Sequence, residues 1–541
     1  MSIRACMRCF LLLALASLLA ACGTEAPLTP TAVSGVAGNA GGAPTGPQEL
    51  VVGAPTDTYV IAPPEKVTLG MYPTNTGIYE TLVRLGPDYQ VVPVLATSWD
   101  FVAPNTWRFT LRQGVTFHDG QKFTAQAVKA TMDRIAKAGG GTPGIGPDSV
   151  KIVDDYTVEI TPSRPNLRLV QQITHPNYSI IAPGSDPATK PVGTGPFTFV
   201  EYAKGDHITV ARNPNYWGDK AKLDKITFRF MPDDNSRVLA LKAGDVQAIY
   251  DVPREVAGEV GKTAGLKVVT SPVGAYEALY VSAHGQAPYD LGSDPAIRQA
   301  LSLAINKASI VHDVWHDNAA VNSTMIPVRI LGASANLVQG SSFDPAQAKQ
   351  VLDKAGWTVG SDGIRSKGGR RLSLTMVVGF PTPEIHRPMP EVVQAQLKDV
   401  GIELKIVTTS DTATYDDKLT AGAGDLWAEV GNQNDANPCF LPDLLFYGKV
   451  APGKQPGNYA RLFAPGPAFD SFIEGCRAAV TQEDVAKNAA GAMHVIIDQE
   501  HIVIPIAGIF RIYAMKDTVQ GFTAHPSSTN QRWDGVYLGS Q

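Results

Sequence analysis

Strand-like and helix-like hydrophobic patterns alternate through most of this 541-residue chain, and this alternation limits the fold more than any other feature. Trp107 to Arg112 alternates large apolar and polar residues, as a half-buried strand does. Thr124 to Ala136 has helical spacing with Thr124 as the cap, and Tyr156 to Ile160 and Ile226 to Phe230 read as further strands. The alternation predicts an α/β fold in which helices pack on mixed sheets.

Two helices later in the chain are predicted from their first residues. Asp294-Pro295 and Asp344-Pro345 each place a capping side chain before a proline at the first helical position, which is a strong start signal. Gly356 is expected to stop the second of these helices because glycine readily adopts the left-handed conformation beyond a helix end.

The N-terminus predicts export. Arg4 and Arg8 precede an apolar stretch of 12 residues, Phe10 to Ala21, which suits a signal peptide and is too short to span a bilayer comfortably. The following Cys22 resembles the acceptor of a bacterial lipobox, and the alternative is an ordinary cleavage site with a chance cysteine. We therefore expect a signal peptide at 1–21, then a lipidated Cys22 and a flexible, Gly- and Pro-rich tether through residue 48.

Charge and cysteine content exclude several classes of protein. Lys+Arg minus Asp+Glu is 46 − 51 = −5, which argues against a nucleic-acid surface. Of the five cysteines, only Cys439 and Cys476 lie in the body of the chain, too few for a disulfide scaffold. In an oxidising compartment they predict one disulfide, with two separate buried thiols as the alternative.

The common enzyme motifs are missing from the chain. There is no G-x-x-x-x-G-K-[ST], no G-x-S-x-G and no H-E-x-x-H. His312 and His316 stand four apart on a predicted helix, but no third metal ligand is near them, so solvated or capping roles are favoured. We expect no catalytic residue, no bound metal and no cofactor, although a catalytic carboxylate pair could escape a motif search.

A series of longer motifs carries a resemblance to a known family. It begins with Tyr79 to Val83 and Val92 to Trp99 and continues through Trp107 to Ala125. Later members of the series are Gly193–Phe197, Arg212–Gly218, Ala243–Val246, Ile297–Leu301, Asp344–Ala346 and Ala355–Trp357. With these motifs in this order, the chain resembles the solute-binding proteins of peptide/nickel-type ABC importers, which include dipeptide-, oligopeptide- and nickel-binding members. The resemblance covers about residues 50–540.

The resemblance implies a periplasmic-binding-protein-like clamshell of two mixed-sheet lobes with an additional subdomain, closing on its ligand by hinge motion. Lobe I is expected at 49–78, 191–279 and 508–541, the subdomain at 79–190 and lobe II at 280–507. Gly193 and Gly195 are expected where two backbone segments approach closely. The implied protein is a monomer that docks on the permease of an ABC importer and meets the membrane only through its lipid anchor.

The resemblance also directs attention to the segment Asp425 to Pro438 as the ligand site. Peptide-binding relatives place an Asp four residues before the proline to hold the peptide ammonium, and here that position is Asn434, with Asp435 next to it. A neutral amide lacks the charge that makes an ammonium contact strong. By the same spacing, the position of a cleft histidine in nickel-binding relatives falls on Glu429, and that of their arginine falls on Asp133, beside Arg134. The candidate ligand-binding residues are Asn434, Asp435, Glu429, Asn432, Trp427, Arg387, Arg134 and Tyr513.

These residues predict an extracytoplasmic lipoprotein that binds a small ligand without changing it chemically. Short peptides are favoured over a nickel chelate, because peptide binders are the more numerous members of the family. Core roles compete evenly with ligand contact for Trp427 and Tyr513, and a solvated role competes with it for Arg134 and Arg387. The alternatives from other classes are a surface peptidase and a signalling or adhesion lipoprotein that no longer transports.

Overall fold

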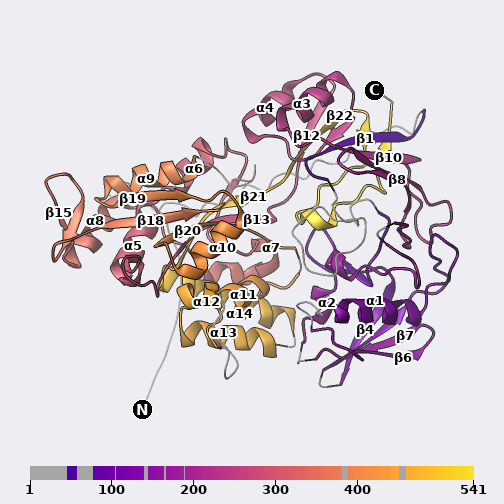
Figure 1. The fold of residues 1–541 in the computed structure, drawn as a ribbon, viewed down its shortest axis with the longest axis horizontal. Coiled ribbons are helices and arrows are strands. Elements are labelled where there is room, and N and C mark those ends of the chain that lie inside the picture. The colour runs from indigo at the N-terminus through magenta and orange to yellow at the C-terminus, as the bar shows by residue number, and fades with distance from the viewer. Residues whose placement is uncertain are drawn as a thin grey trace, which may run out of the picture. The chain divides into compact units, whose positions relative to one another are not determined.

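The structure is a computed structural model that describes residues 46–57, 77–103, 105–138, 144–163, 166–187, 189–379, 388–434, 436–449, 458–479 and 481–540. The expected signal peptide, Cys22, Arg387 and Asp435 lie outside these residues, as does the tether as far as residue 45. The described residues fall within one compact unit, residues 42–541. The mixed α/β fold class expected from the sequence is confirmed (Figure 1).

The largest sheet joins strands from three distant parts of the chain. Its seven strands are, in spatial order, β12 (Leu266–Thr270), β22 (Ile512–Lys516), β11 (Ala248–Ile249), β1 (Glu49–Ala54), β10 (Lys225–Phe230), β9 (His207–Arg212) and β8 (Phe197–Ala203). β1 runs parallel to β10 and β11, and the other neighbours are antiparallel. One face packs against α3 (Asp234–Ala243) and α4 (Arg254–Lys262). The other face buries an aromatic cluster that includes Trp533.

A four-stranded antiparallel sheet forms a second core between β1 and β8 in the chain. Its strands are, in spatial order, β4 (Ala96–Ala103), β5 (Thr106–Leu111), β7 (Thr157–Ile160) and β6 (Val150–Asp154). The helix α1 (Ala125–Lys137) lies against it, as Figure 1 shows. Beside this sheet are the hairpin of β2 (Val83–Leu85) and β3 (Val91–Pro93) and the short helix α2 (Leu169–Gln172).

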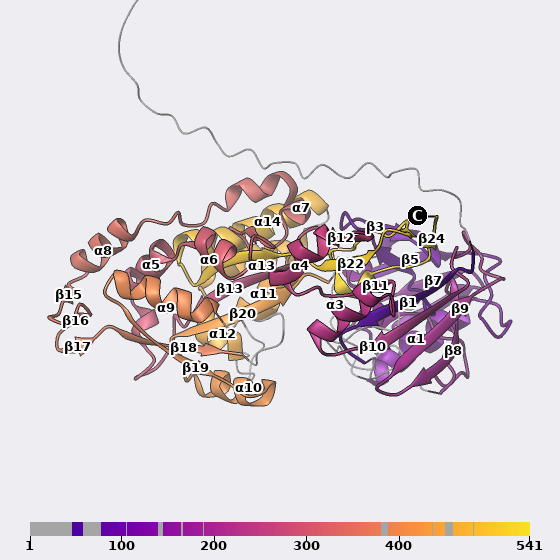
Figure 2. The same ribbon diagram turned by 90° about the horizontal axis from the view of Figure 1, so that it is seen from above.

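The third core surrounds a six-stranded mixed sheet with helices on both faces (Figure 2). Its strands are, in spatial order, β14 (Ala320–Val321), β21 (Val503–Ile509), β13 (Ala275–Val281), β20 (Leu426–Asn432), β18 (Ser373–Val378) and β19 (Glu403–Thr408). Successive side chains of β13 alternate between two apolar clusters, Leu279 joining one and Tyr280 the other. This is the strand period expected of a sheet that is covered on both sides.

Different helices bury their apolar faces in the two clusters. The first cluster contains α5 (Pro295–Ala304), α6 (Lys307–Asp313), α8 (Pro345–Lys354) and α9 (Met389–Asp399). The second contains α7 (Val328–Leu331), α10 (Thr412–Ala421), α11 (Phe440–Phe446), α12 (Asn458–Phe463), α13 (Pro467–Ala478) and α14 (Gln482–His494). None of the helices in the described ranges combines the length and apolarity that crossing a membrane requires.

Short strands complete the fold at the periphery. They are β15 (Thr358–Val359), β16 (Arg365–Lys367) and β17 (Arg370–Arg371), together with the pair β23 (Val519–Gln520) and β24 (Tyr537–Leu538). Both pairings within the first group and the pairing of β23 with β24 are antiparallel.

The helix starts follow from the predicted caps. Asp294 accepts a hydrogen bond from the backbone N–H of Ala296 at 2.9 Å, and Asp344 accepts one from that of Gln347 at 2.8 Å. Thr124 occupies the cap position of α1 without a capping hydrogen bond from its side chain.

His316 lies beyond the end of α6, so it does not share a helix face with His312.

The predicted close backbone approach is confirmed at two glycines. A Cβ on Gly193 would lie 2.1 Å from the carbonyl oxygen of Ile78, and one on Gly195 would lie 2.1 Å from that of Gly77. Gly195 also donates its N–H to the Ile78 carbonyl at 3.0 Å. These contacts fix the segment before β8 against the segment that leads to β2, next to the site described below.

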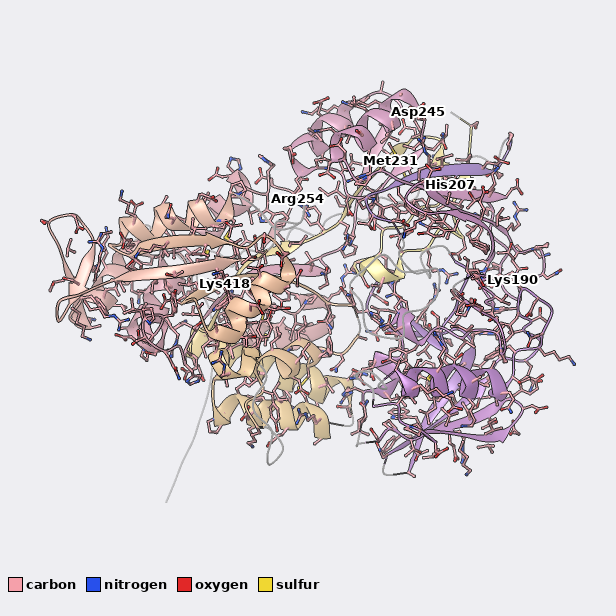
Figure 3. All side chains as sticks on the ribbon, viewed as in Figure 1. Lys190, His207, Met231, Asp245, Arg254 and Lys418 are labelled. Atoms are coloured by element: carbon pink, nitrogen blue, oxygen red, sulfur yellow. A yellow bond between two sulfur atoms is a disulfide. The ribbon has the colours of Figure 1, made fainter. Side chains whose placement is uncertain are left out.

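Two connections join the seven-stranded and six-stranded sheets and run side by side. The first leads from β12 to β13 and the second from β21 to β22, and Ser271 donates its N–H to the Arg511 carbonyl at 2.9 Å. Arg254, at the start of α4 (Figure 3), donates to the carbonyls of Asn318 at 2.8 Å and Phe510 at 3.3 Å. Paired connections of this kind suit a hinge. The expected lobe limits stay a prediction.

Candidate functional site

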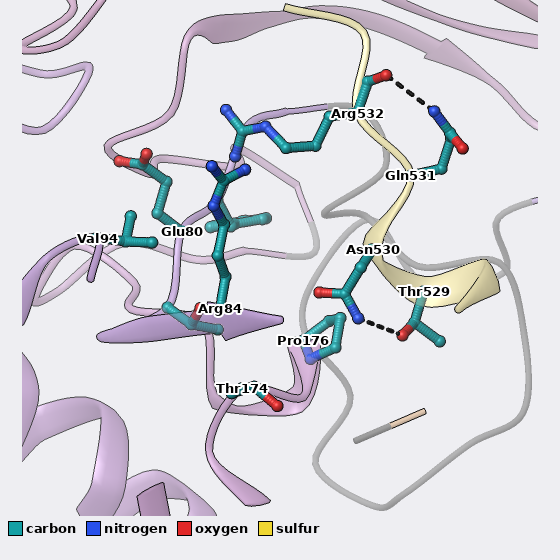
Figure 4. A pocket seen from close by; sticks show the side chains of 11 residues that line it. Glu80, Arg84, Val94, Thr174, Pro176, Thr529, Asn530, Gln531 and Arg532 are labelled. Carbon is teal, nitrogen blue, oxygen red and sulfur yellow. Dashed lines mark hydrogen bonds between the residues drawn. The ribbon is translucent and has the colours of Figure 1, made fainter. Parts of the chain in front are cut away.

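A polar cavity lies between the β2 hairpin and the C-terminal segment (Figure 4). Its volume is about 40 Å³. Three segments far apart in the sequence line it: the residues around β2, the turn after α2, and the residues that end the 3₁₀ helix Ser528–Asn530. The lining residues are Tyr79, Glu80, Thr81, Arg84, Val94, Thr174, Pro176, Thr529, Asn530, Gln531 and Arg532.

Glu80 forms a buried wall of this cavity and is held by three donors. Its carboxylate accepts hydrogen bonds from Tyr216 Oη at 2.7 Å, Trp217 Nε1 at 2.9 Å and Thr194 Oγ1 at 2.9 Å. Burial raises the pKa of Glu80, while Arg532 and the three donors oppose that rise. Because Thr194 lies between the two close-packed glycines, the carboxylate also ties that segment to β2.

Two arginines, Arg84 and Arg532, line the same cavity. Arg532 donates from Nε to Asp534 Oδ1 at 2.7 Å. Burial is the largest single influence and lowers the pKa of Arg532, but Asp534, Tyr216 and Glu80 together outweigh it, so the net shift is upward. Burial and then the neighbouring Arg532 guanidinium lower the pKa of Arg84. Among the described residues, none forms a hydrogen bond or ion pair with the half-buried Arg84 side chain.

Further polar atoms near the cavity are buried without partners. The Tyr79 hydroxyl, the Gln171 Oε1 and both side-chain amide atoms of Asn177 have no hydrogen-bond partner among the described residues. Each such atom costs about 1–3 kcal/mol relative to a satisfied one. A ligand that supplied partners to this region would remove part of that cost.

The predicted residue Asn434 lies close to this cavity. Asn434 follows β20, and its Oδ1 accepts a hydrogen bond from Ser527 Oγ at 3.2 Å. Ser527 precedes the lining residues Thr529 and Asn530, and Asn530 donates to Ser527 Oγ at 3.2 Å. On the same loop, the Gln433 carbonyl accepts a hydrogen bond from Tyr89 Oη at 3.4 Å. The loop after β20 therefore contacts both the β2 hairpin and the C-terminal segment.

Glu429 belongs to a separate cluster in the middle of β20. Its Oε1 accepts hydrogen bonds from the hydroxyls of Tyr415 and Tyr459, the latter at 2.9 Å. Burial raises the pKa of Glu429 to about 7, although both tyrosines oppose the rise. Asn432, at the end of the same strand, is half-buried and pairs with Ala275 of β13.

Of the remaining predicted residues, two lie in the core and Arg134 lies outside the cavity lining. Trp427 is fully buried and donates from Nε1 to Ser282 Oγ at 2.9 Å. Tyr513 is buried between aromatic rings. Both side chains are therefore part of the core, which was one of the two roles considered for them. Burial raises the pKa of the Tyr79 phenol, and the charge of Arg134, on α1, opposes that rise. Among the described residues, no group of three or more His, Cys, Asp or Glu could hold a metal ion.

The disulfide predicted between Cys439 and Cys476 is present. It joins the residue before α11 to α13, with Cα atoms 6.3 Å apart, and thereby anchors the far end of the loop that carries Asn434.

Sequence reasoning missed the central residues of the cavity. Glu80 was recognised only as part of a family motif, and Arg84 and Arg532 were not singled out. A usable signal existed, because Glu80 and Arg84 are the charged residues of a mostly apolar run from Ile78 to Leu85. Charged residues in such a run are expected to be paired or functional.

Comparisons with known proteins identify the family. The family model for the middle part of the bacterial extracellular solute-binding proteins, family 5, matches residues 90–452. A nickel-binding periplasmic protein of Escherichia coli K12 is 28% identical over 359 residues, covering 62% of this chain and 67% of that protein. The glutathione-binding protein GsiB of Salmonella paratyphi A is 30% identical over 350 residues, covering 61% of this chain and 63% of that protein. The match thus spans less than two thirds of this second relative.

A solved structure extends the likeness over most of the fold. NikA from Brucella suis, in complex with Fe(III)-EDTA, has a TM-score of 0.78 at 24% identity, covering 91% of this chain and 99% of that one. The relatives are named for binding rather than for catalysis, which agrees with the expectation that the chain is not an enzyme. The chain belongs to the bacterial extracellular solute-binding proteins of family 5.

Proposed function

We propose that this protein binds a small ligand outside the cytoplasm and delivers it, chemically unchanged, to the permease of an ABC importer. The observation that carries the proposal is the polar cavity lined by Glu80, Arg84 and Arg532 in a chain of this family. Its wall contacts the loop after β20, which is attached to a different sheet. Ligand contacts at such a junction would favour the closed arrangement of the lobes.

The proposed ligand is a short peptide. The similarity to a glutathione-binding protein supports this class of ligand. Asn434 is neutral and its amide oxygen is already engaged by Ser527, so it is poorly suited to hold the charged ammonium of a peptide. We therefore expect recognition to rest less on the amino end of the ligand than in relatives with an Asp at this position.

A nickel chelate is the second candidate. One observation favours it: the 28% identity to a nickel-binding periplasmic protein. In this version, the small organic acid that surrounds the metal would make most contacts with the protein.

Cys22 is proposed as a lipid anchor that holds a monomeric receptor at the outer side of the cell membrane. The substitution Cys22→Ser should move the protein from the membrane fraction to the soluble fraction while leaving ligand binding intact. Release of the unsubstituted protein without detergent would contradict anchoring and leave the binding function untouched.

Analysis of what the protein carries from its native host tests the transport proposal. The full chain is purified without added ligand and denatured, and the released small molecules are identified by mass spectrometry together with metal analysis. We expect one equivalent of intact short peptides. Stoichiometric nickel with a small acid would reverse the order of the two candidates, and release of cleaved peptides during incubation would support the peptidase alternative instead.

A further inference from the structure

We propose that the cavity between the β2 hairpin and the C-terminal segment is a carboxylate subsite, in which Arg84 and Arg532 hold an acidic group of the ligand. This inference rests on the proposed function and specifies the chemistry of its ligand: a small molecule with a free carboxylate, such as the C-terminus of a peptide.

The donors are already assembled. A guanidinium has five N–H donors. Arg532 uses Nε for Asp534, and no hydrogen bond of its terminal nitrogens to a described residue is present. Arg84 has no such bond at all within the described part of the chain. Figure 4 shows the two guanidinium groups next to each other at the cavity.

The nearby carboxylates are committed elsewhere. Glu80 accepts three hydrogen bonds from residues that do not line the cavity, and Asp534 is paired with Arg532. When Glu80 and Asp534 are both ionised, their two negative charges balance the two arginines. Burial favours protonation of Glu80, and the protonated state leaves one excess positive charge. In either state, the N–H groups of Arg84 face the cavity without an acceptor from the described protein.

The cavity also has a suitable size and suitable neutral walls. The volume of about 40 Å³ exceeds the roughly 10–15 Å³ that one water needs, so a carboxylate group can enter. The hydroxyl-bearing residues Thr174 and Thr529 line it beside the arginines. Gln531 makes its hydrogen bonds within the C-terminal segment, including one to the Arg532 carbonyl at 3.0 Å, which fixes the backbone that carries Arg532.

Peptides with and without a free carboxylate provide the test. A tripeptide library with free C-termini, the same library as C-terminal amides, and citrate with and without nickel are presented to the ligand-stripped full chain, and binding is measured by native mass spectrometry and calorimetry. The variants are Arg84→Gln, Arg84→Lys and the control Arg229→Gln. The control removes the same charge from an exposed arginine on β10.

We expect free-acid ligands to bind about tenfold to a hundredfold more tightly than amides, a loss of that preference in Arg84→Gln, and its retention in Arg229→Gln. Arg84→Lys should recover part of it, because an ammonium keeps the charge but not the bidentate fork. Binding of citrate alone, dependent on Arg84, would identify a free small acid as the source of the carboxylate.

Two outcomes would overturn the subsite in different ways. Equal binding of acids and amides to the unsubstituted chain would refute the subsite and leave peptide transport standing, even if the Arg84 variants failed to fold. Absence of binding to every peptide and citrate probe would refute the subsite and peptide transport together.

Discussion

Removal of the Glu80 carboxylate should destabilise the protein more than the loss of any one of its hydrogen bonds. Glu80 is only 4% exposed, and three donors converge on it at 2.7 to 2.9 Å. In Glu80→Ala these three donors lose their acceptor, at about 1–3 kcal/mol each. Rotation of the hydroxyls, entry of water and relief of the buried charge offset part of this sum, so we expect a total of about 3–5 kcal/mol.

A variant that lacks one donor calibrates this estimate. Thr194→Val removes one donor and leaves the carboxylate with two, so it should cost about 1–2 kcal/mol. The double variant Glu80→Ala with Thr194→Val should lose clearly less free energy of unfolding than the two single variants lose in sum. Both substitutions remove the same hydrogen bond, so its loss is counted once. Glu159→Ala, which removes a strand glutamate whose partners Arg108 and Lys151 are exposed, should have a much smaller effect.

Urea unfolding at pH 7, followed by both tryptophan fluorescence and circular dichroism, measures these differences. Coincidence of the two probes establishes whether a single free energy describes the transition. A cost below about 1 kcal/mol for Glu80→Ala, or strict additivity with Thr194→Val, would refute the view that this carboxylate organises the cavity wall.

Three further outcomes are expected. Burial raises the pKa of Glu429 from its ordinary 4.5 to about 7, so the folded state keeps its proton to higher pH than the unfolded chain. The free energy of unfolding of the unsubstituted protein should therefore fall relative to that of Glu429→Gln as pH rises from about 4.5 to 7, and the difference should stay constant above that. Urea titrations at successive pH values measure this difference, and a difference that does not change with pH would contradict the expectation. The double substitution Cys439→Ser with Cys476→Ser opens a loop with a separation of 37 residues and should cost about 4 kcal/mol. A reductant should leave the melting temperature of this double variant unchanged and should lower that of the unsubstituted protein. Gly193→Ala places a Cβ against the Ile78 carbonyl and should cost at least about 2 kcal/mol in urea unfolding, and a neutral effect would disprove the close packing.

Local rules were sufficient for much of the fold. The Asp-Pro starts of α5 and α8 were predictable because a capping side chain and a proline act on the adjacent turn. Gly193 and Gly195 were predictable in the same way, since close backbone approach excludes a Cβ. The alternating apolar residues likewise predicted strands, because each pattern depends on residues a few positions apart.

The candidate site depends on contacts that no local rule contains. The cavity brings Arg84 next to Arg532, which are separated by most of the chain, and only the completed fold shows that Arg84 lacks a partner among the described residues. Trp427 was ambiguous for a different reason, since a buried aromatic residue and a ligand-stacking one have the same hydrophobic pattern in sequence. The spacing rule that selected Asn434 was more useful, because it placed that residue on the loop that reaches the C-terminal segment.

Hydrogen–deuterium exchange, compared between the ligand-stripped full chain and the chain reloaded with its co-purifying ligand, tests the central claim most directly. If the ligand binds at the polar cavity, backbone protection should increase in residues 79–84, 174–176 and 529–532, the three segments that line it. Protection confined to other parts of the chain, with these three segments unchanged, would contradict the account.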